Sequence, residues 1–416
     1  MKLKSQIIPL AQVLSFAVTM FLAPSAVSAT KYKVLHTFGA GQDGSVPSGP
    51  LLIDGKGRLY GNTANGGTGK CSDYSCGITF ELLPEDDGWW KEVIIHEFTG
   101  GKDGAIPTGN IIADPAGNLY STLAGDVPGQ AAVFELSHGS VGWKISLLYQ
   151  PFVSPGLVLD HAGNLYGPLG PGKYSAGAIG RLSPGSHGWS YRQLYSFCHS
   201  SECLDGDEPY APLIWDRSGN LYGTTLYGGN GPPKCPGNLG CGVVFQMVRD
   251  EHGGWTYRIL HRFASSPNDG QNPVGGLVMD ASGDLYGTTE GGGPSGDGTV
   301  FKLAFVNGNW QKTVLYAFPD CADGCIPGST LVFDKKGNLY GAASGGNQGC
   351  GPDTCGTIFK LTRQKNDKWS YSVLHKFRGP DGNFPWGVVI DGKGNIFGTT
   401  ESGGTYNAGV AFEIMP

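Results

Sequence analysis

Aspartates that are each followed by glycine recur along the chain, and their carboxylates could serve as ligands. The series comprises Asp43, Asp103, Asp205, Asp269, Asp323 and Asp381. Asp-Gly is also common in tight turns, because Asp bonds to nearby backbone and Gly tolerates positive φ. A ring of carboxylates and carbonyls would instead suit Ca²⁺, a hard cation that prefers oxygen ligands. Both interpretations stay open, and Ca²⁺ is the one cofactor that the pattern indicates.

Two glutamates and a tryptophan could form a sugar-binding or catalytic centre. Glu290 and Glu401 each follow Gly-Thr-Thr, and Trp386 stands in Phe-Pro-Trp-Gly. A tryptophan ring can stack on a sugar, and two convergent carboxyls could act as general acid and base. With His199, these residues would serve a polysaccharide lyase or a glycoside hydrolase. Standard hydrolase, metalloprotease and nucleotide-binding signatures are absent from the sequence, so it assigns no catalytic residue.

The ten cysteines form five close pairs, which predict local disulfides. An even count at short spacing favours disulfide bonds in an exported chain. Metal thiolates are the rival interpretation, but the histidines are not placed to complete zinc sites. The expected pairs are Cys71–Cys76, Cys198–Cys203, Cys235–Cys241, Cys321–Cys325 and Cys350–Cys355.

The first 29 residues have the pattern of a secretory signal peptide. Lys2 and Lys4 precede an apolar stretch, and small residues suit cleavage after Ala29. A membrane anchor is the rival interpretation, but the apolar stretch is short and interrupted by proline and glutamine. We expect a secreted, periplasmic or cell-surface protein. Its net charge of −6 gives no attraction to nucleic acid or anionic membranes.

The candidate binding residues and the cysteines are positioned by a repeat with the signature Asp-x-x-Gly-Asn-Leu-Tyr-Gly-Thr-Thr. Its aromatic residue recurs at intervals of 46 to 64 residues, which indicates repeated supersecondary units. Asp at the first position and Gly at the fourth suit a type I turn with a bulge. The repeated aspartates are therefore predicted to form turns and not to act in catalysis. They are Asp54, Asp114, Asp160, Asp216, Asp280, Asp334 and Asp391.

Each unit is predicted to contain four short strands: an apolar one, the motif strand, one like Gly-Thr-Val-Phe-Lys-Leu, and one that begins at a tryptophan. In the last strand, alternate side chains should share one face of the sheet. In the final copy these are Trp369, Tyr371, Val373, His375 and Phe377. His375 and its equivalents in other copies are then expected to be packing residues.

Seven such units around an axis predict an all-β fold, a seven-bladed β-propeller with four strands per blade. Residues 30–416 should form this single domain. The chain after the signal peptide begins with a fourth strand and ends with a third strand. Residues 33–38 should therefore pair with residues 409–415 and close the last blade, which removes the exposed edges of an open array.

The combined pattern resembles the GloVer, or "choice-of-anchor", family of exported tandem-repeat proteins. The resemblance covers residues 31–416 and rests on the motif above together with Gly-Thr-Val-Phe-Lys-Leu, Trp-x-x-x-Val-Leu-His-x-Phe and Asp-Gly-x-x-Pro. It implies a repeat protein of unassigned biochemical role, and it supplies no catalytic residues.

The strand order predicts that one face of the propeller is the functional one. The cysteine pairs, the Asp-Gly series, Glu290, Glu401 and Trp386 all fall in connections on that face, whereas the other face carries the tight turns. Rigid loops bind at a lower entropic cost. We therefore predict a monomeric, non-catalytic recognition module for an extracellular carbohydrate or surface protein. The ligand-binding candidates are Trp386, Glu290, Glu401, Asp43, Asp103, Asp269, Asp323 and Asp381.

Overall fold

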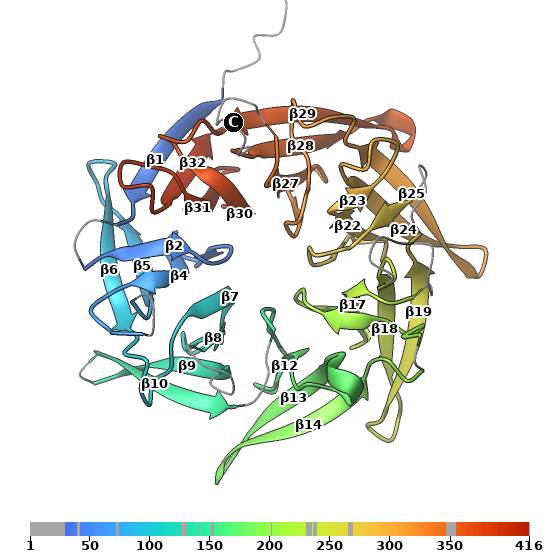
Figure 1. Cartoon of the computed structure of the whole chain (residues 1–416), viewed down its shortest axis with the longest axis horizontal. Coiled ribbons are helices and arrows are strands. Elements are labelled where there is room, and N and C mark those ends of the chain that lie inside the picture. The colour runs from blue at the N-terminus through green and yellow to red at the C-terminus, as the bar shows by residue number, and fades with distance from the viewer. Residues whose placement is uncertain are drawn as a thin grey trace, which may run out of the picture.

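Seven antiparallel sheets stand as blades around a central axis in the computed structural model of the chain (Figure 1). This confirms the predicted all-β, seven-bladed propeller. The structure describes residues 30–39, 42–71, 75–125, 131–140, 142–150, 154–200, 202–229, 235, 239–264, 269–346 and 355–415. The predicted signal peptide lies outside these residues. The described part contains no helix with the length and hydrophobicity to span a membrane.

The strands of each blade run from the axis outward. Blade 1 consists of β2 (Gly44–Pro47) and β3 (Leu52–Ile53), then β4 (Leu59–Gly66), β5 (Ile78–Pro84) and β6 (Trp90–Glu97). Blade 2 consists of β7 (Pro107–Ala113), β8 (Leu119–Leu123), β9 (Ala132–Gly139) and β10 (Gly142–Tyr149). Blade 3 consists of β11 (Val158–Leu159), β12 (Leu165–Pro168), β13 (Ala178–Gly185) and β14 (Gly188–Ser196). Blade 4 consists of β15 (Asp207–Pro209) and β16 (Ile214–Trp215), then β17 (Leu221–Tyr227), β18 (Val243–Arg249) and β19 (Trp255–Arg262).

The remaining three blades follow the same order. Blade 5 consists of β21 (Val278–Met279), β22 (Leu285–Thr289), β24 (Thr299–Val306) and β25 (Asn309–Ala317), with a separate ribbon of β20 (Gly270–Gln271) and β23 (Gly291–Gly292). Blade 6 consists of β26 (Val332–Phe333), β27 (Leu339–Ala343), β28 (Thr357–Arg363) and β29 (Trp369–Lys376). Blade 7 consists of β30 (Asn383–Ile390), β31 (Ile396–Ser402), β32 (Val410–Met415) and β1 (Lys31–Thr37). Two 3₁₀ turns, η1 (Lys173–Ser175) and η4 (Lys365–Asp367), lie in connections.

The ring closes by pairing the first strand with the last, as the sequence predicted. β1 lies antiparallel to β32, with Lys31 opposite Met415 and Thr37 opposite Val410. In Figure 1 the blue first strand lies beside the red strands of blade 7. Blade 7 therefore takes three strands from one end of the chain and one from the other, and β1 pairs with the edge that β32 would otherwise leave open.

The Asp-x-x-Gly motif is a hydrogen-bonded turn, which bears out its predicted scaffold role. In blade 4, Asp216 Oδ1 accepts hydrogen bonds from the backbone N–H of Ser218 and Asn220, both at 2.8 Å. Its Oδ2 accepts from the Asn220 side chain at 2.8 Å and from the Tyr222 hydroxyl at 3.0 Å. One carboxylate thus ties the turn to the Asn and Tyr of the motif. We call the side of the ring that carries these turns the turn face.

The glycine of the motif strand leaves room for large side chains of the neighbouring strand and of the preceding connection. A Cβ on Gly223 would lie 2.6 Å from the Phe245 ring and 2.6 Å from a methyl carbon of Leu213. Phe245 and its equivalents in the third strands are fully buried. Between blades, the tryptophan near the start of a fourth strand packs on the motif aromatic residue of the preceding blade at five junctions of the described chain, as Trp255 does on Tyr166. These five junctions are therefore held by the same kind of contact.

The fourth strands contain a bulge that the alternating pattern did not predict. Phe359 of β28 pairs with Val373 but Ile358 pairs with His375, so Leu374 is an extra residue. A bulge reverses the side to which the following residues point. Tyr371 stacks on Tyr316 of blade 5, whereas His375 stacks on Tyr32 in blade 7. The prediction that Trp369 to Phe377 share one face is therefore wrong beyond the bulge.

Candidate functional site

A cavity of 670 Å³ lies on the central axis and is lined by all seven blades. Its wall is formed by the beginnings of the innermost strands and by residues that follow the motif strands. Both sets lie at the end of the axis away from the Asp-x-x-Gly turns. We call this side, which carries the connections between second and third strands and between blades, the loop face. The apolar part of the wall includes Pro50, Pro155, Pro212, Val274 and Val388.

Trp386 reaches this cavity because of an irregularity in its strand. In blade 7, Pro385 pairs with Thr400 but Gly387 pairs with Thr399, so Trp386 is the extra residue of a bulge. Bulges re-aim side chains and are common beside functional sites. The tryptophan is 37% exposed and lines the cavity. Tyr210, which is 40% exposed, is a second aromatic residue of the wall.

The two candidate glutamates both lie at the cavity. Glu401 lies in β31, directly after the Gly-Thr-Thr of the motif, and lines the wall. Glu290 lies against Gly328, another wall residue: a Cβ added to Gly328 would be 3.1 Å from Glu290 Oε1. Burial raises the pKa of Glu290 above its ordinary value. Burial also raises the pKa of Tyr210, and the negative charge of Glu290 adds to that effect.

The charged side chain in the described wall of the cavity is acidic. The described residues that line it include Glu401 but no lysine, arginine or histidine. With Glu290 beside the wall, the cavity combines an apolar surface, two aromatic rings and two carboxyls. Such a site disfavours anions, because their charge would meet carboxylates with no compensating cation.

The aspartates of the Asp-Gly series do not line this cavity. Each is engaged near the outer strands with side chains of its own or the next blade. His36 lies 2.9 Å from Asp43, His96 lies 3.2 Å from Asp103, and His375 lies 2.9 Å from Asp381. Asp269 contacts both His261 and Lys312, and Asp323 contacts Lys376. The sequence placed these aspartates with Trp386, Glu290 and Glu401 on one face, but only the latter three lie at the cavity.

His–Asp pairing is the regular feature that sequence reasoning missed. A signal was present, because every blade with this histidine also has an Asp-Gly six to eight residues later. The pairing was missed because the number of residues between the histidine and the aspartate differs among the blades. Burial would raise the pKa of Asp381, but hydrogen bonds from His375 and from backbone outweigh burial and hold the pKa below its ordinary value.

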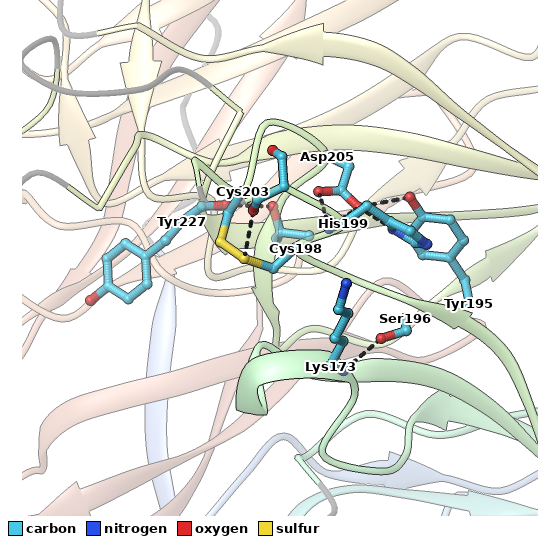
Figure 2. The surroundings of a disulfide bond; sticks show 10 residues. Lys173, Tyr195, Ser196, Cys198, His199, Cys203, Asp205 and Tyr227 are labelled. Atoms are coloured by element: carbon cyan, nitrogen blue, oxygen red, sulfur yellow. Dashed lines mark hydrogen bonds and ion pairs between the residues drawn. A yellow bond between two sulfur atoms is a disulfide. The ribbon is translucent and has the colours of Figure 1, made fainter.

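His199 belongs to this outer set and not to the cavity. Its imidazole Nδ1 lies 2.8 Å from Asp205 Oδ2, which also accepts the Tyr195 hydroxyl hydrogen bond at 2.8 Å. Figure 2 shows this group beside the Cys198–Cys203 disulfide. The His199 side chain is 61% exposed. The three residues that an enzyme was predicted to use are therefore not brought together, because only the two glutamates lie at the cavity.

Four of the five predicted disulfides are confirmed. They join Cys71 to Cys76, Cys198 to Cys203, Cys235 to Cys241, and Cys321 to Cys325. The fifth predicted pair includes Cys350, which lies outside the described residues. All four bonds close short connections on the loop face.

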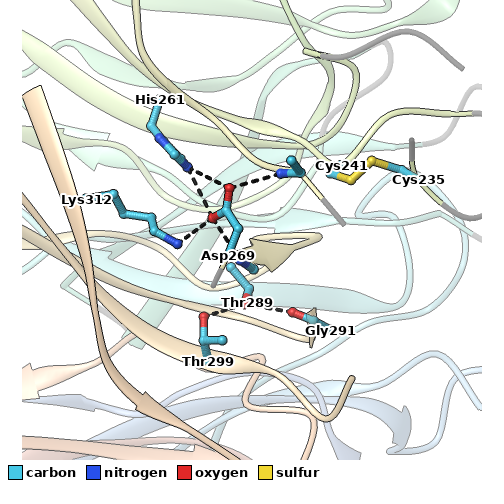
Figure 3. A network of polar contacts seen from close by, with 10 residues as sticks. Cys235, Cys241, His261, Asp269, Thr289, Gly291, Thr299 and Lys312 are labelled. Carbon is cyan, nitrogen blue, oxygen red and sulfur yellow. Dashed lines mark hydrogen bonds and ion pairs between the residues drawn. A yellow bond between two sulfur atoms is a disulfide. The ribbon is translucent and has the colours of Figure 1, made fainter. Parts of the chain in front are cut away.

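On the loop-face side, six junctions between blades share one pattern among the described residues. The second residue after the tryptophan of a fourth strand, or Tyr32 at the equivalent position of β1, contacts the fourth strand of the preceding blade or the connection that follows it. Four junctions use stacked rings: Tyr191 on Tyr149, Tyr257 on Tyr195, Tyr371 on Tyr316, and Tyr32 on His375. Two junctions instead bring charged residues to a His–Asp pair. Lys312 contacts Asp269 between blades 4 and 5 (Figure 3), and Glu92 lies beside His36 between blades 7 and 1.

The fold and its central cavity define a seven-bladed β-propeller with an aromatic, anionic pocket on its loop face. Residues 148–351 and 235–416 each match the Gloeobacter/Verrucomicrobia repeat family, and together they span more than half of the chain. The chain belongs to this family. No curated protein matches it.

Solved structures with a similar outline share little sequence with the chain. A luciferin-regenerating enzyme is 12% identical with a TM-score of 0.44, covering 90% of this chain and 92% of that one. Candidate 6-phosphogluconolactonases from Bacteroides uniformis and Bacteroides fragilis are 11% and 14% identical, with TM-scores of 0.49 and 0.45. The first covers 88% of this chain and 87% of its own, and the second 90% and 89%. No function is transferred from them.

Proposed function

We propose that this is an exported, non-catalytic recognition protein that binds a carbohydrate at the cavity on the loop face. The observation that carries the proposal is the placement of Trp386. A bulge turns this large aromatic side chain out of the regular ladder and into a cavity, where it stays 37% exposed. An indole that is more than a third exposed offers a flat surface for a sugar ring. Tyr210 provides a second such surface.

The charge of the cavity narrows the class of sugar. Glu401 in the wall and Glu290 beside it can accept hydrogen bonds from hydroxyl or ammonium groups. Uronates, sulfated sugars and phosphorylated sugars would place their anions against these carboxyls. The preferred ligand is thus a neutral or amine-bearing glycan.

The rest of the loop face supports recognition of a ligand larger than one sugar. Large hydrophobic side chains that are exposed gather there, although such residues also occur singly on ordinary surfaces. On this face they are Tyr174, Leu204, Tyr210, Leu239, Ile326, Trp386 and Tyr406. A glycan chain, or a surface protein that carries one, could extend from the cavity across these residues.

A glycan array with the protein lacking residues 1–29 tests the proposal. We expect binding to neutral or amine-bearing glycans and none to uronates. The array is repeated with Ca²⁺ and with chelator, because Ca²⁺ bridging is the alternative that the Asp-Gly series suggested. Binding that requires Ca²⁺, or a preference for anionic glycans, would contradict the proposed mode.

An enzyme acting on polysaccharide is the second candidate, and one observation favours it. Burial raises the pKa of Glu290, as a general acid requires. Incubation of each array hit with the protein, followed by mass analysis of the products, separates the two candidates. Turnover that disappears in Glu290→Gln or Glu401→Gln would assign an enzyme. Binding without turnover supports the recognition protein.

A further inference from the structure

The junction between blades 7 and 1, which we call the closing junction because it contains the closing strand β1, brings together three side chains that can bind a metal. His36 lies on β1, Asp43 follows in the connection to blade 1, and Glu92 lies on β6. His36 Nε2 is 2.9 Å from Asp43 Oδ2 and 3.8 Å from Glu92 Oε2. All three ligand atoms lie within 4.8 Å of one another, which the described residues show nowhere else for three His, Cys, Asp or Glu side chains.

The equivalent junction between blades 4 and 5 serves as a comparison, because it also contains a His–Asp pair. There the pair is His261 and Asp269, and the strand of the next blade supplies Lys312, whose ammonium contacts Asp269 (Figure 3). Glu92 occupies the position of Lys312 in the closing junction, two residues after the tryptophan of its strand. One junction thus has a cation in contact with the aspartate, and the other has a second carboxyl.

The closing junction also contains a polar atom without a partner. Glu92 Oε1 is buried and has no hydrogen-bond partner among the described residues. The side chains of Asp43 and Glu92 are 8% and 14% exposed. Two carboxyls buried this closely repel each other when both are charged. A cation between them would relieve that repulsion, and bidentate binding by Glu92 would also engage Oε1.

We propose that His36, Asp43 and Glu92 bind a divalent transition-metal ion of the Zn²⁺ class. The donor set of one imidazole nitrogen and two carboxylates suits such an ion. Tetrahedral zinc separates its ligand atoms by about 3.3 Å, and the observed separations of 2.9 and 3.8 Å lie on either side of that value. Ca²⁺ does not fit, because it takes oxygen ligands and many of them.

The position of the site gives the metal a structural task. Its ligands come from the first strand, from the connection that follows, and from the outer strand of blade 1. A bound ion would therefore fix β1, the strand that closes blade 7, to blade 1. Metal bound to the folded state alone raises stability by mass action.

Titration calorimetry with ZnCl₂ tests this on chelator-treated protein lacking residues 1–29, at pH 8.5 so that the ligands are deprotonated. We expect one Zn²⁺ per chain and a higher unfolding temperature with Zn²⁺ than with EDTA. Glu92→Gln and His36→Gln should each weaken binding by at least about tenfold. Cobalt should give a visible absorption band in the unaltered protein and lose it in both variants, which reports the ligands independently of stability.

His375→Gln is the matched control. His375 belongs to the same kind of pair, with Asp381, but faces the neutral Tyr32. This variant should bind Zn²⁺ as the unaltered protein does. The proposal is overturned if the unaltered protein binds no Zn²⁺, or if Glu92→Gln and His36→Gln bind it with unchanged stoichiometry and affinity, which would indicate adventitious binding elsewhere. Stabilisation by Ca²⁺ in place of Zn²⁺ would also overturn it.

Discussion

The two faces of the ring use the same strands for different purposes. On the turn face, each motif begins with an aspartate that is saturated with hydrogen bonds, as Asp216 is by two backbone groups, Asn220 and Tyr222. On the loop face, the same blades end in connections of unequal length, and a bulge exposes Trp386. Repetition on one face and variation on the other suggest that the turn face supplies stability and the loop face supplies recognition.

The pKa values of a turn aspartate and of the cavity glutamate Glu290 are shifted in opposite directions. For Asp334 on the turn face, burial would raise the pKa, but hydrogen bonds from Asn338 and the backbone outweigh burial and lower the pKa below its ordinary value of 3.8. For Glu290 on the loop face, burial raises the pKa above its ordinary value of 4.5. A turn carboxylate is therefore stabilised in its charged form, whereas the cavity carboxyl is not.

The largest expected effect comes from removing the closing strand, on which both faces depend. Deletion of residues 30–38 removes β1 and the fully buried Phe38, and it leaves the edge of β32 unpaired. We expect aggregation or the loss of cooperative unfolding, measured by calorimetry and light scattering. A truncated protein that melts as the full ring does would contradict the closure.

A smaller loss in the free energy of unfolding should distinguish a variant on the turn face from a variant at the cavity. Asp216→Ala leaves two backbone N–H groups, Asn220 and Tyr222 without their acceptor, and should lower the free energy of unfolding by about 1–3 kcal/mol. Glu401→Ala, in the cavity wall, should change it by about 0.5 kcal/mol or less. Urea unfolding measures both. Equal losses would show that stability is not concentrated on the turn face.

The smallest effects concern pH, and their signs are opposite for the turn carboxylate Asp334 and the cavity glutamate Glu290. Because the pKa of Asp334 is lowered, its contribution is full above pH 3.8 and is lost as the pH falls below that value. Because the pKa of Glu290 is raised, its contribution is full below pH 4.5 and is lost as the pH rises through the raised pKa.

Unfolding free energies from pH 3 to 8 check these signs in two variants. Asp334→Asn should reduce the loss of stability on the acid side. Glu290→Gln should raise stability at neutral pH relative to the unaltered protein, since it removes a buried charge. A fall in stability at neutral pH with Glu290→Gln would mean that its carboxylate has a stabilising partner.

Repetition explains why so much of the fold could be predicted from the sequence. The seven copies of the motif defined the blades, the turns and the strand order, and the incomplete first and last units indicated the closing pair. Strict alternation failed at the fourth strands, where Leu374 and its equivalents form a bulge. A bulge changes the direction of side chains without changing residue types, so the pattern gave no sign of it.

The candidate site could be predicted only in part. Glu290 and Glu401 were predicted because both follow Gly-Thr-Thr on the loop-rich face, and Trp386 because its ring on that face could stack on a sugar. The aspartates of the Asp-Gly series were grouped with them, although they bond locally to histidine or lysine. Their partners lie across loops of six to eight residues or on the next blade, and spacing alone does not encode such contacts.

The most direct test of the central claim is a calorimetric titration of an array-positive neutral or amine-bearing glycan into three proteins: the unaltered chain, Trp386→Ala and Trp89→Ala. Trp89 is an exposed tryptophan on the turn face, with 69% of its surface accessible. We predict that Trp386→Ala weakens binding by about tenfold or more, worth about 1.4 kcal/mol, with an unchanged unfolding temperature, and that Trp89→Ala binds normally. Undiminished binding by Trp386→Ala, or a loss confined to Trp89→Ala, would contradict recognition by the loop face.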